Sequence, residues 1–119
     1  METQFILVVE NGLLDRGMLS EALQKQGFFV RFASDAETAL RILIQVPPSL
    51  ILLSLIMPNL DSYTFTRILK NDEATRSITI MALSDIDSNH KQIISSGFDG
   101  SVYMEDHKDT FAKKLRNFF

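Results

Sequence analysis

Two apolar runs stand out along the chain. Residues 5–9 are apolar throughout, and residues 50–55 are apolar except for Ser54. Runs of this length without polar alternation are typical of strands that are buried on both faces of a parallel sheet. Pro58 has no N–H to donate to a neighbouring strand, so the second run is expected to end before it. Ser54 is therefore the one polar side chain of a central strand, near its carboxyl end.

The remaining segments alternate between strand-like and helix-like patterns. Further strands are expected at residues 28–32, 78–83 and 101–104, the first of them at a sheet edge because its alternation is only partial. Apolar side chains recur at spacings of three and four between the strands, which predicts helices. These positions are Leu14, Met18, Leu19, Ala22 and Leu23; Ala36, Ala39, Leu40, Leu43 and Ile44; Phe65, Ile68 and Leu69; Ile86, His90, Ile93 and Ile94; and Phe111, Ala112, Leu115 and Phe118.

Five strand–helix units with short connections require parallel strands joined by right-handed crossovers. The predicted fold class is α/β, with a doubly wound, five-stranded parallel sheet covered by five helices. A length of 119 residues, 45% of them hydrophobic, fits a single domain over residues 1–119 with a well-filled core.

The amino-acid composition excludes several kinds of site and partner. The absence of cysteine excludes disulfides, thiol nucleophiles and zinc–thiolate sites. A net charge of −3 argues against a domain whose main partner is nucleic acid, because phosphate binding needs clustered Lys and Arg. The N-terminal apolar run is far shorter than the roughly 20 residues that span a bilayer. We therefore expect a soluble, cytoplasmic protein without membrane or nucleic-acid contact by this domain.

The segment around Ser54 resembles the phosphoacceptor segment of bacterial two-component response-regulator receiver domains, the CheY-like superfamily. The family pattern is an apolar run, an aspartate, Met-Pro, two further residues and Asp-Gly. Met57, Pro58 and Asp61 match it, whereas Ser54 stands at the acceptor aspartate and Ser62 at the glycine.

The resemblance extends over essentially the whole chain. Residues 5–10 match the first strand of the family and the acid that follows it, and residues 97–100, Gly-Phe-Asp-Gly, resemble the stretch before the fifth strand. It implies a flavodoxin-like sheet with the strand order 2-1-3-4-5.

An intact receiver carries five groups at its phosphorylation site. Two acids after the first strand and the acceptor aspartate hold Mg²⁺, while a Ser or Thr after the fourth strand and a Lys after the fifth bind the phosphoryl oxygens. The resemblance places Glu10, Asn11, Ser54, Ser84 and Met104 at these positions. Three of the five groups are changed, and each change removes a charge. We expect a degenerate site without catalytic residues or a metal ligand set, and with Mg²⁺ binding weak or absent.

Each of these residues has a plainer interpretation. Ser54 is a space-filling residue unless it accepts a phosphoryl group itself, and Glu10 is a solvated acid at a strand end unless it remains a metal ligand. Ser84 and Asp85 form an N-cap pair for the fourth helix unless they contribute to the pocket. His90 is expected at the edge of the core.

The resemblance also singles out the fifth strand. Receivers usually carry an aromatic switch residue where this chain has Ser101. Tyr103 lies two residues further on, so it points to the same side of the strand, as an interface anchor or as a packing residue.

The expected function is that of a pseudo-receiver, a signalling module without enzymatic activity that works by phosphorylation-independent protein–protein interaction. The expected partner is a histidine kinase, an output domain or another signalling protein. The resemblance implies contact through the first helix, or through the face of the fourth helix, fifth strand and fifth helix, which could also bind a second copy of the chain. Two other functions stay open: a receiver that still takes a phosphoryl group from a histidine kinase at Ser54, and a regulatory domain that binds a small ligand.

Overall fold

The fold is seen in a computed structural model that describes residues 5–12, 14–57, 59–84, 89–104 and 108–117. Strands and helices alternate along these residues, as the sequence predicts. The strands are β1 (Phe5–Val9), β2 (Phe29–Ala33), β3 (Leu50–Ser54), β4 (Thr79–Ser84) and β5 (Gly100–Tyr103). The helices are α1 (Arg16–Lys25), α2 (Ala36–Gln45), α3 (Ser62–Asn71), α4 (His90–Ser95) and α5 (Lys108–Arg116).

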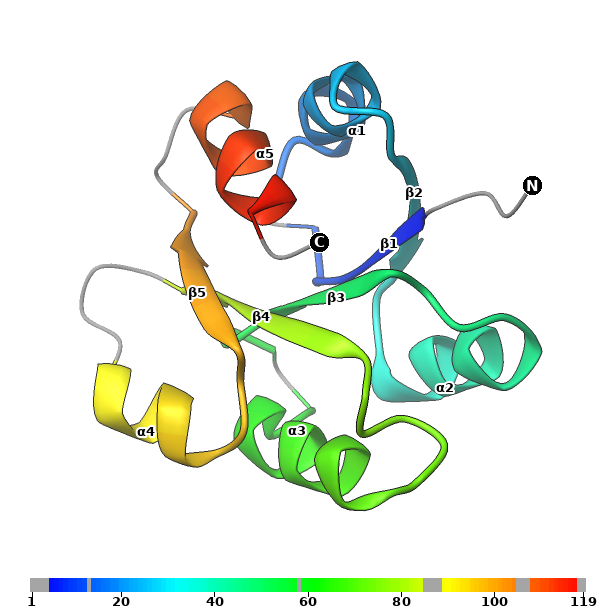
Figure 1. The fold of residues 1–119 in the computed structure, drawn as a ribbon, viewed down its shortest axis with the longest axis vertical. Coiled ribbons are helices and arrows are strands. Elements are labelled where there is room, and N and C mark those ends of the chain that lie inside the picture. The colour runs from blue at the N-terminus through cyan, green and yellow to red at the C-terminus, as the bar shows by residue number, and fades with distance from the viewer. Residues whose placement is uncertain (1–4, 13, 58, 85–88, 105–107, 118–119) are drawn as a thin grey trace.

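The strands form one parallel sheet in the order β2-β1-β3-β4-β5. This confirms the doubly wound fold, its strand order and the edge position of β2. Helices α1 and α5 cover one face of the sheet, and α2, α3 and α4 cover the other (Figure 1). Because all strands run in the same direction, their carboxyl ends lie along a single edge of the sheet, where ligands bind in folds of this kind.

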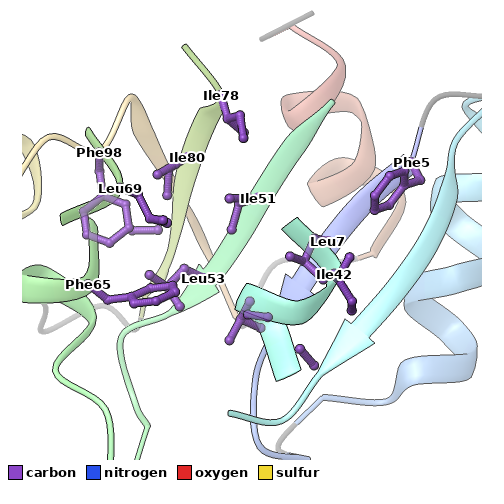
Figure 2. Packing of buried hydrophobic residues seen from close by; sticks show 14 of the residues in the cluster. Phe5, Leu7, Ile42, Ile51, Leu53, Phe65, Leu69, Ile78, Ile80 and Phe98 are labelled. Atoms are coloured by element: carbon purple, nitrogen blue, oxygen red, sulfur yellow. The ribbon is translucent and has the colours of Figure 1, made fainter. Parts of the chain in front are cut away.

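The central strands send alternate side chains into two separate hydrophobic clusters. Leu7 and Ile51 pack under α2 and α3 in the cluster drawn in Figure 2. Ile6 and Leu52 belong to the second cluster, under α1 and α5. All four side chains are fully buried, which confirms that β1 and β3 are covered on both faces.

Several residues of the predicted apolar helix stripes are exposed to solvent. In α2, Leu40 is exposed and Ile44 is 84% exposed, because the helix turns Ala39 and Ile42 toward the sheet. The buried stripe is thus rotated away from the one predicted. The other exposed members of the predicted stripes are Met18, Ile68, Ile94 and His90.

Side chains cap the helices at their N-termini. Asp15, Asp35 and Asp61 cap α1, α2 and α3, and Asn89 caps α4. The prediction that Ser84 caps the fourth helix is wrong, since this residue ends β4 and the helix begins at His90. Four residues of the sequence-based predictions lie outside the described residues: Pro58, Asp85, Ile86 and Phe118.

Candidate functional site

Four of the five predicted site residues line the carboxyl edge of the sheet. Glu10 directly follows β1, Ser54 ends β3, Ser84 ends β4, and Met104 directly follows β5. These strands are neighbours in the sheet, and neighbouring strands lie about 4.8 Å apart. The fold therefore brings the four residues into one row. Asn11 lies at the same edge, in the bend after Glu10, with an exposed side chain.

Glu10 is buried rather than solvated, so the expectation of a solvated acid at a strand end is wrong. Its side chain is only 1% exposed. The Oε2 atom accepts the backbone N–H of Gly12 at 2.6 Å and that of Leu14 at 3.4 Å. The Oε1 atom accepts Nε of Arg16 at 2.5 Å. Both carboxylate oxygens thus have partners from the chain itself.

The turn after β1 depends on Gly12. Its φ angle is +96°, which residues other than glycine rarely adopt. The turn brings the N–H of Gly12 back toward the carboxylate two residues earlier. A residue with a Cβ here would strain the backbone that holds Glu10.

Arg16 belongs to this site by its contacts, although the sequence pattern does not single it out. It is the first residue of α1, a start that Asp15 fixes by accepting the N–H of Met18 at 3.0 Å. Its Nη2 donates to the backbone carbonyl of Glu10 and to the Ser34 hydroxyl, both at 3.2 Å. The available signal was a basic residue at a predicted helix start shortly after a buried strand that ends in an acid.

The hydroxyl of Ser54 is engaged within the turn that follows β3. Ser54 is 1% exposed. Its Oγ accepts the N–H of Ile56 at 3.1 Å and donates to the carbonyl of the same residue at 3.3 Å. The backbone carbonyl of Ser54 in turn accepts the buried Ser62 hydroxyl at 2.6 Å. Two serines therefore hold the connection between β3 and α3.

Ser84 and Met104 join the ends of β4 and β5. The Ser84 side chain is buried, and its hydroxyl donates to the carbonyl of Val102 at 3.4 Å. The backbone N–H of Met104 donates to the carbonyl of Ser84 at 2.9 Å. The Met104 side chain is half-buried and packs against the cluster under α1 and α5. An apolar side chain therefore occupies the position at which the sequence resemblance places the lysine of receiver domains.

The described residues at this edge do not fit a magnesium ion. Mg²⁺ prefers carboxylate and other hard oxygen ligands in octahedral geometry. Glu10 is the one carboxylate in the row of site residues, and its oxygens are bound by Arg16 and by backbone amides. In the part of the chain that the structure describes, no three His, Cys, Asp or Glu side chains gather into a metal-binding group.

Asp61, which matches the receiver motif, acts as a helix cap. Its carboxylate accepts the Thr64 hydroxyl at 2.8 Å and the N–H groups of Thr64 and Tyr63 at 3.3 and 3.1 Å. These hydrogen bonds, above all those from Thr64, lower the pKa of Asp61 below its ordinary value.

The two interface candidates lie on β5, the edge strand opposite β2. Tyr103 is 45% exposed, and the Lys114 ammonium of α5 lies 5.7 Å from the centre of its ring. Ser101 is half-buried. Tyr103 therefore joins β5 to α5 at the surface.

The fold and the sequence match the same family of known proteins. Residues 6–116 match the model of the response regulator receiver domain. A probable transcriptional regulator, ycf27, of Guillardia theta is 33% identical over 81 residues, which are 68% of this chain and 32% of that protein. The response regulator PleD of Caulobacter vibrioides is 33% identical over 88 residues, 74% of this chain and 19% of that protein. The chain thus spans about a third or less of these two relatives.

Solved structures show the same fold. The chemotaxis response regulator CheY4 of Vibrio cholerae superposes with a TM-score of 0.87 at 21% identity, over 99% of this chain and 100% of that one. The response regulator RPA3017 of R. palustris gives a TM-score of 0.78 at 27% identity, over 96% and 90%. None of the described helices is long and apolar enough to cross a membrane. Taken with the strand order and the row of residues at the carboxyl edge, these matches establish that the chain belongs to the response regulator receiver domain family.

Proposed function

We propose that this receiver domain is a pseudo-receiver, which signals through protein contacts and takes no phosphoryl group at Ser54. The supporting observation is the state of the Ser54 hydroxyl, which is buried and bonded to both the N–H and the carbonyl of Ile56. A serine becomes a nucleophile when an adjacent base takes its proton. Among the described residues, no carboxylate or imidazole is bonded to this hydroxyl.

The charges at the site favour the same conclusion. Phosphoryl transfer needs cations that neutralise the charge developing on the phosphoryl oxygens. The Glu10 carboxylate is bound to Arg16 instead of being free for Mg²⁺, and an uncharged Met104 stands at the position of the family lysine. The residues that would hold the metal ion and the phosphoryl group are therefore replaced or engaged elsewhere.

The partner is a histidine kinase, an output domain or another signalling protein. The similar proteins are named as transcriptional and response regulators, and they are much longer than this chain. We assign the contact surface to α4, β5 and α5, because Tyr103 offers a large, half-exposed ring there beside Lys114. A second copy of the chain is the alternative occupant of this surface.

Phosphoryl uptake is the decisive test. The purified chain is incubated with acetyl phosphate and MgCl₂, or with a phosphorylated histidine kinase, and its intact mass is then measured. An active receiver domain serves as the positive control, and we expect no added phosphate on this chain. A gain of mass that Ser54→Ala abolishes would establish Ser54 as the acceptor and refute the proposal. A gain that survives Ser54→Ala would refute it as well and would locate the acceptor elsewhere.

A further inference from the structure

We propose that the guanidinium of Arg16 is the resident counter-ion of the site and replaces the divalent cation that receivers bind. The inference deepens the proposed function and rests on it, because it identifies what balances the remaining acid once metal-dependent chemistry is lost. If Arg16 fills this role, the stability of the fold should be the same with and without Mg²⁺.

Both carboxylate oxygens of Glu10 already have hydrogen-bond donors. Nε of Arg16 contacts Oε1, while the N–H groups of Gly12 and Leu14 face Oε2. The carboxylate is 1% exposed, whereas the Arg16 side chain is 38% exposed and closes the site from outside. A metal ion would have to displace the guanidinium to reach Oε1, or the two backbone N–H groups to reach Oε2.

Arg16 is held in place by contacts with three parts of the chain besides the Glu10 carboxylate. Its Nη2 bonds the Glu10 carbonyl and the Ser34 hydroxyl, and its Cζ lies 4.7 Å from the centre of the Phe32 ring. An aromatic face at this distance attracts a cation. The contacts join α1, the end of β1 and the end of β2, so a swing of the guanidinium away from Glu10 would break all of them together.

A second Arg–Glu pair in the chain differs from the Glu10–Arg16 pair in its exposure. The Arg41–Glu37 pair on α2 has the same N–O separation of 2.5 Å, but its side chains are 70% and 76% exposed. Exposed pairs of this kind contribute little to stability. In the Glu10–Arg16 pair the carboxylate is buried, and a buried carboxylate that loses its cation keeps an uncompensated charge, which is destabilising. The Glu10–Arg16 pair should therefore behave as a coupled unit, and the Arg41–Glu37 pair should not.

A double-mutant cycle in two solutions tests the proposal. Thermal unfolding is measured for the wild type, Glu10→Gln, Arg16→Gln and the double variant, in EDTA and in millimolar MgCl₂, with Arg41→Gln as the matched control. We expect the wild-type midpoint to be the same in both solutions. Each single substitution should lower the midpoint by several degrees, and the double variant should lose less than the sum of the two. Arg41→Gln, which removes only an exposed pair, should match the wild type in both solutions.

Three results would overturn the proposal: a rise of the wild-type midpoint in MgCl₂, additive effects of the two substitutions, or an Arg16→Gln variant as stable as Arg41→Gln. If Arg16→Gln does not fold, the double variant decides, because restored folding supports the coupling and continued failure refutes it. Phosphoryl uptake by the wild type would refute the proposed function without altering this cycle, so the two failures are distinguishable.

Discussion

Lys70 and Asp99, which are 29 positions apart in the sequence, meet at 2.8 Å between the end of α3 and the loop before β5. The same carboxylate oxygen of Asp99 accepts the backbone N–H of Ile80 at 2.8 Å. The Lys70 ammonium also donates to the carbonyl of Ile78 at 2.8 Å. One ion pair therefore supplies partners to backbone groups on both sides of the first residue of β4.

Substitution of Asp99 should destabilise the fold, and the loss should depend on whether the Ile80 N–H keeps a hydrogen-bond acceptor. We expect Asp99→Ala to lower the free energy of unfolding by about 1–3 kcal/mol, because a part-buried N–H loses its acceptor. Asp99→Asn should cost less, since its amide oxygen still accepts from Ile80. Urea denaturation measures both. The control is Glu21→Gln, which removes the exposed Lys25–Glu21 pair and should change stability by less than about 0.5 kcal/mol. Equal losses for Asp99→Ala and Asp99→Asn would contradict the assignment.

An aspartate introduced at position 54 should destabilise the fold, because this position is buried. Ser54 is buried beside the end of β1, where the Glu10 carboxylate already has its counter-ion in Arg16. We expect Ser54→Asp to be less stable than Ser54→Asn, which has the same shape without the charge. Burial raises the pKa of the new carboxyl, so the gap between the two variants should be largest near neutral pH and should close as the pH falls. A pH series of thermal midpoints measures the gap, and an Asp variant as stable as the Asn variant at neutral pH would contradict this.

The cap of α3 should contribute an acid-dependent part of the stability. The Thr64 hydroxyl and the backbone amides lower the pKa of Asp61. A carboxyl whose pKa is lowered by folding stabilises the fold above its unfolded-state pKa, and this contribution is lost as the pH falls through the folded-state pKa. The stability advantage of the wild type over Asp61→Asn should therefore shrink on the acid side of the ordinary aspartate range. Thr64→Ala should move the Asp61 titration to higher pH, as read by carboxyl-carbon NMR. An unchanged titration would show that the hydroxyl contributes nothing.

The surface assigned to partners can be tested at Tyr103. The ring is half-exposed and contacts Lys114, so Tyr103→Ala should cost less than about 1 kcal/mol of stability, the scale of an exposed cation–π contact. If the chain associates through this face, sedimentation velocity should show a weaker self-association for Tyr103→Ala than for the wild type. Met18→Ala, at an exposed position on α1, serves as the control. Self-association that only Met18→Ala reduces would place the contact on α1.

The architecture could be predicted from the sequence because its signals are local and redundant. The apolar runs of β1 and β3, interrupted only by Ser54, are buried only if helices cover both faces of the sheet. The alternation of elements then limits the topology to very few choices. The rotation of α2 could not be predicted, because Leu40 and Ile44 are as apolar as Ile42. Only the position of the helix over the sheet decides which of these faces the core.

The sequence predicts that Glu10, Ser54, Ser84 and Met104 lie at strand ends, as they do, but it does not predict what they contact. The strand ends of a parallel sheet lie along one edge whatever side chains they carry, so Glu10, Ser54, Ser84 and Met104 fall into a row. The partner of Glu10 depends on how the turn at Gly12 redirects the chain and on where α1 begins. Those details follow from backbone angles and a cap rather than from hydrophobic pattern, and Arg16 was therefore missed.

β3 lies between β1 and β4, and a hydrophobic cluster covers each of its faces. This position determines how fast its backbone amides exchange with solvent. Its backbone amides are hydrogen-bonded to neighbouring strands, and its apolar side chains are fully buried. Solvent deuterium should reach these amides only when the whole molecule opens. The exchange rate at Leu52 would then report the free energy of global unfolding. A partner that binds to the folded surface stabilises the whole molecule, so its binding would slow exchange at Leu52 as well.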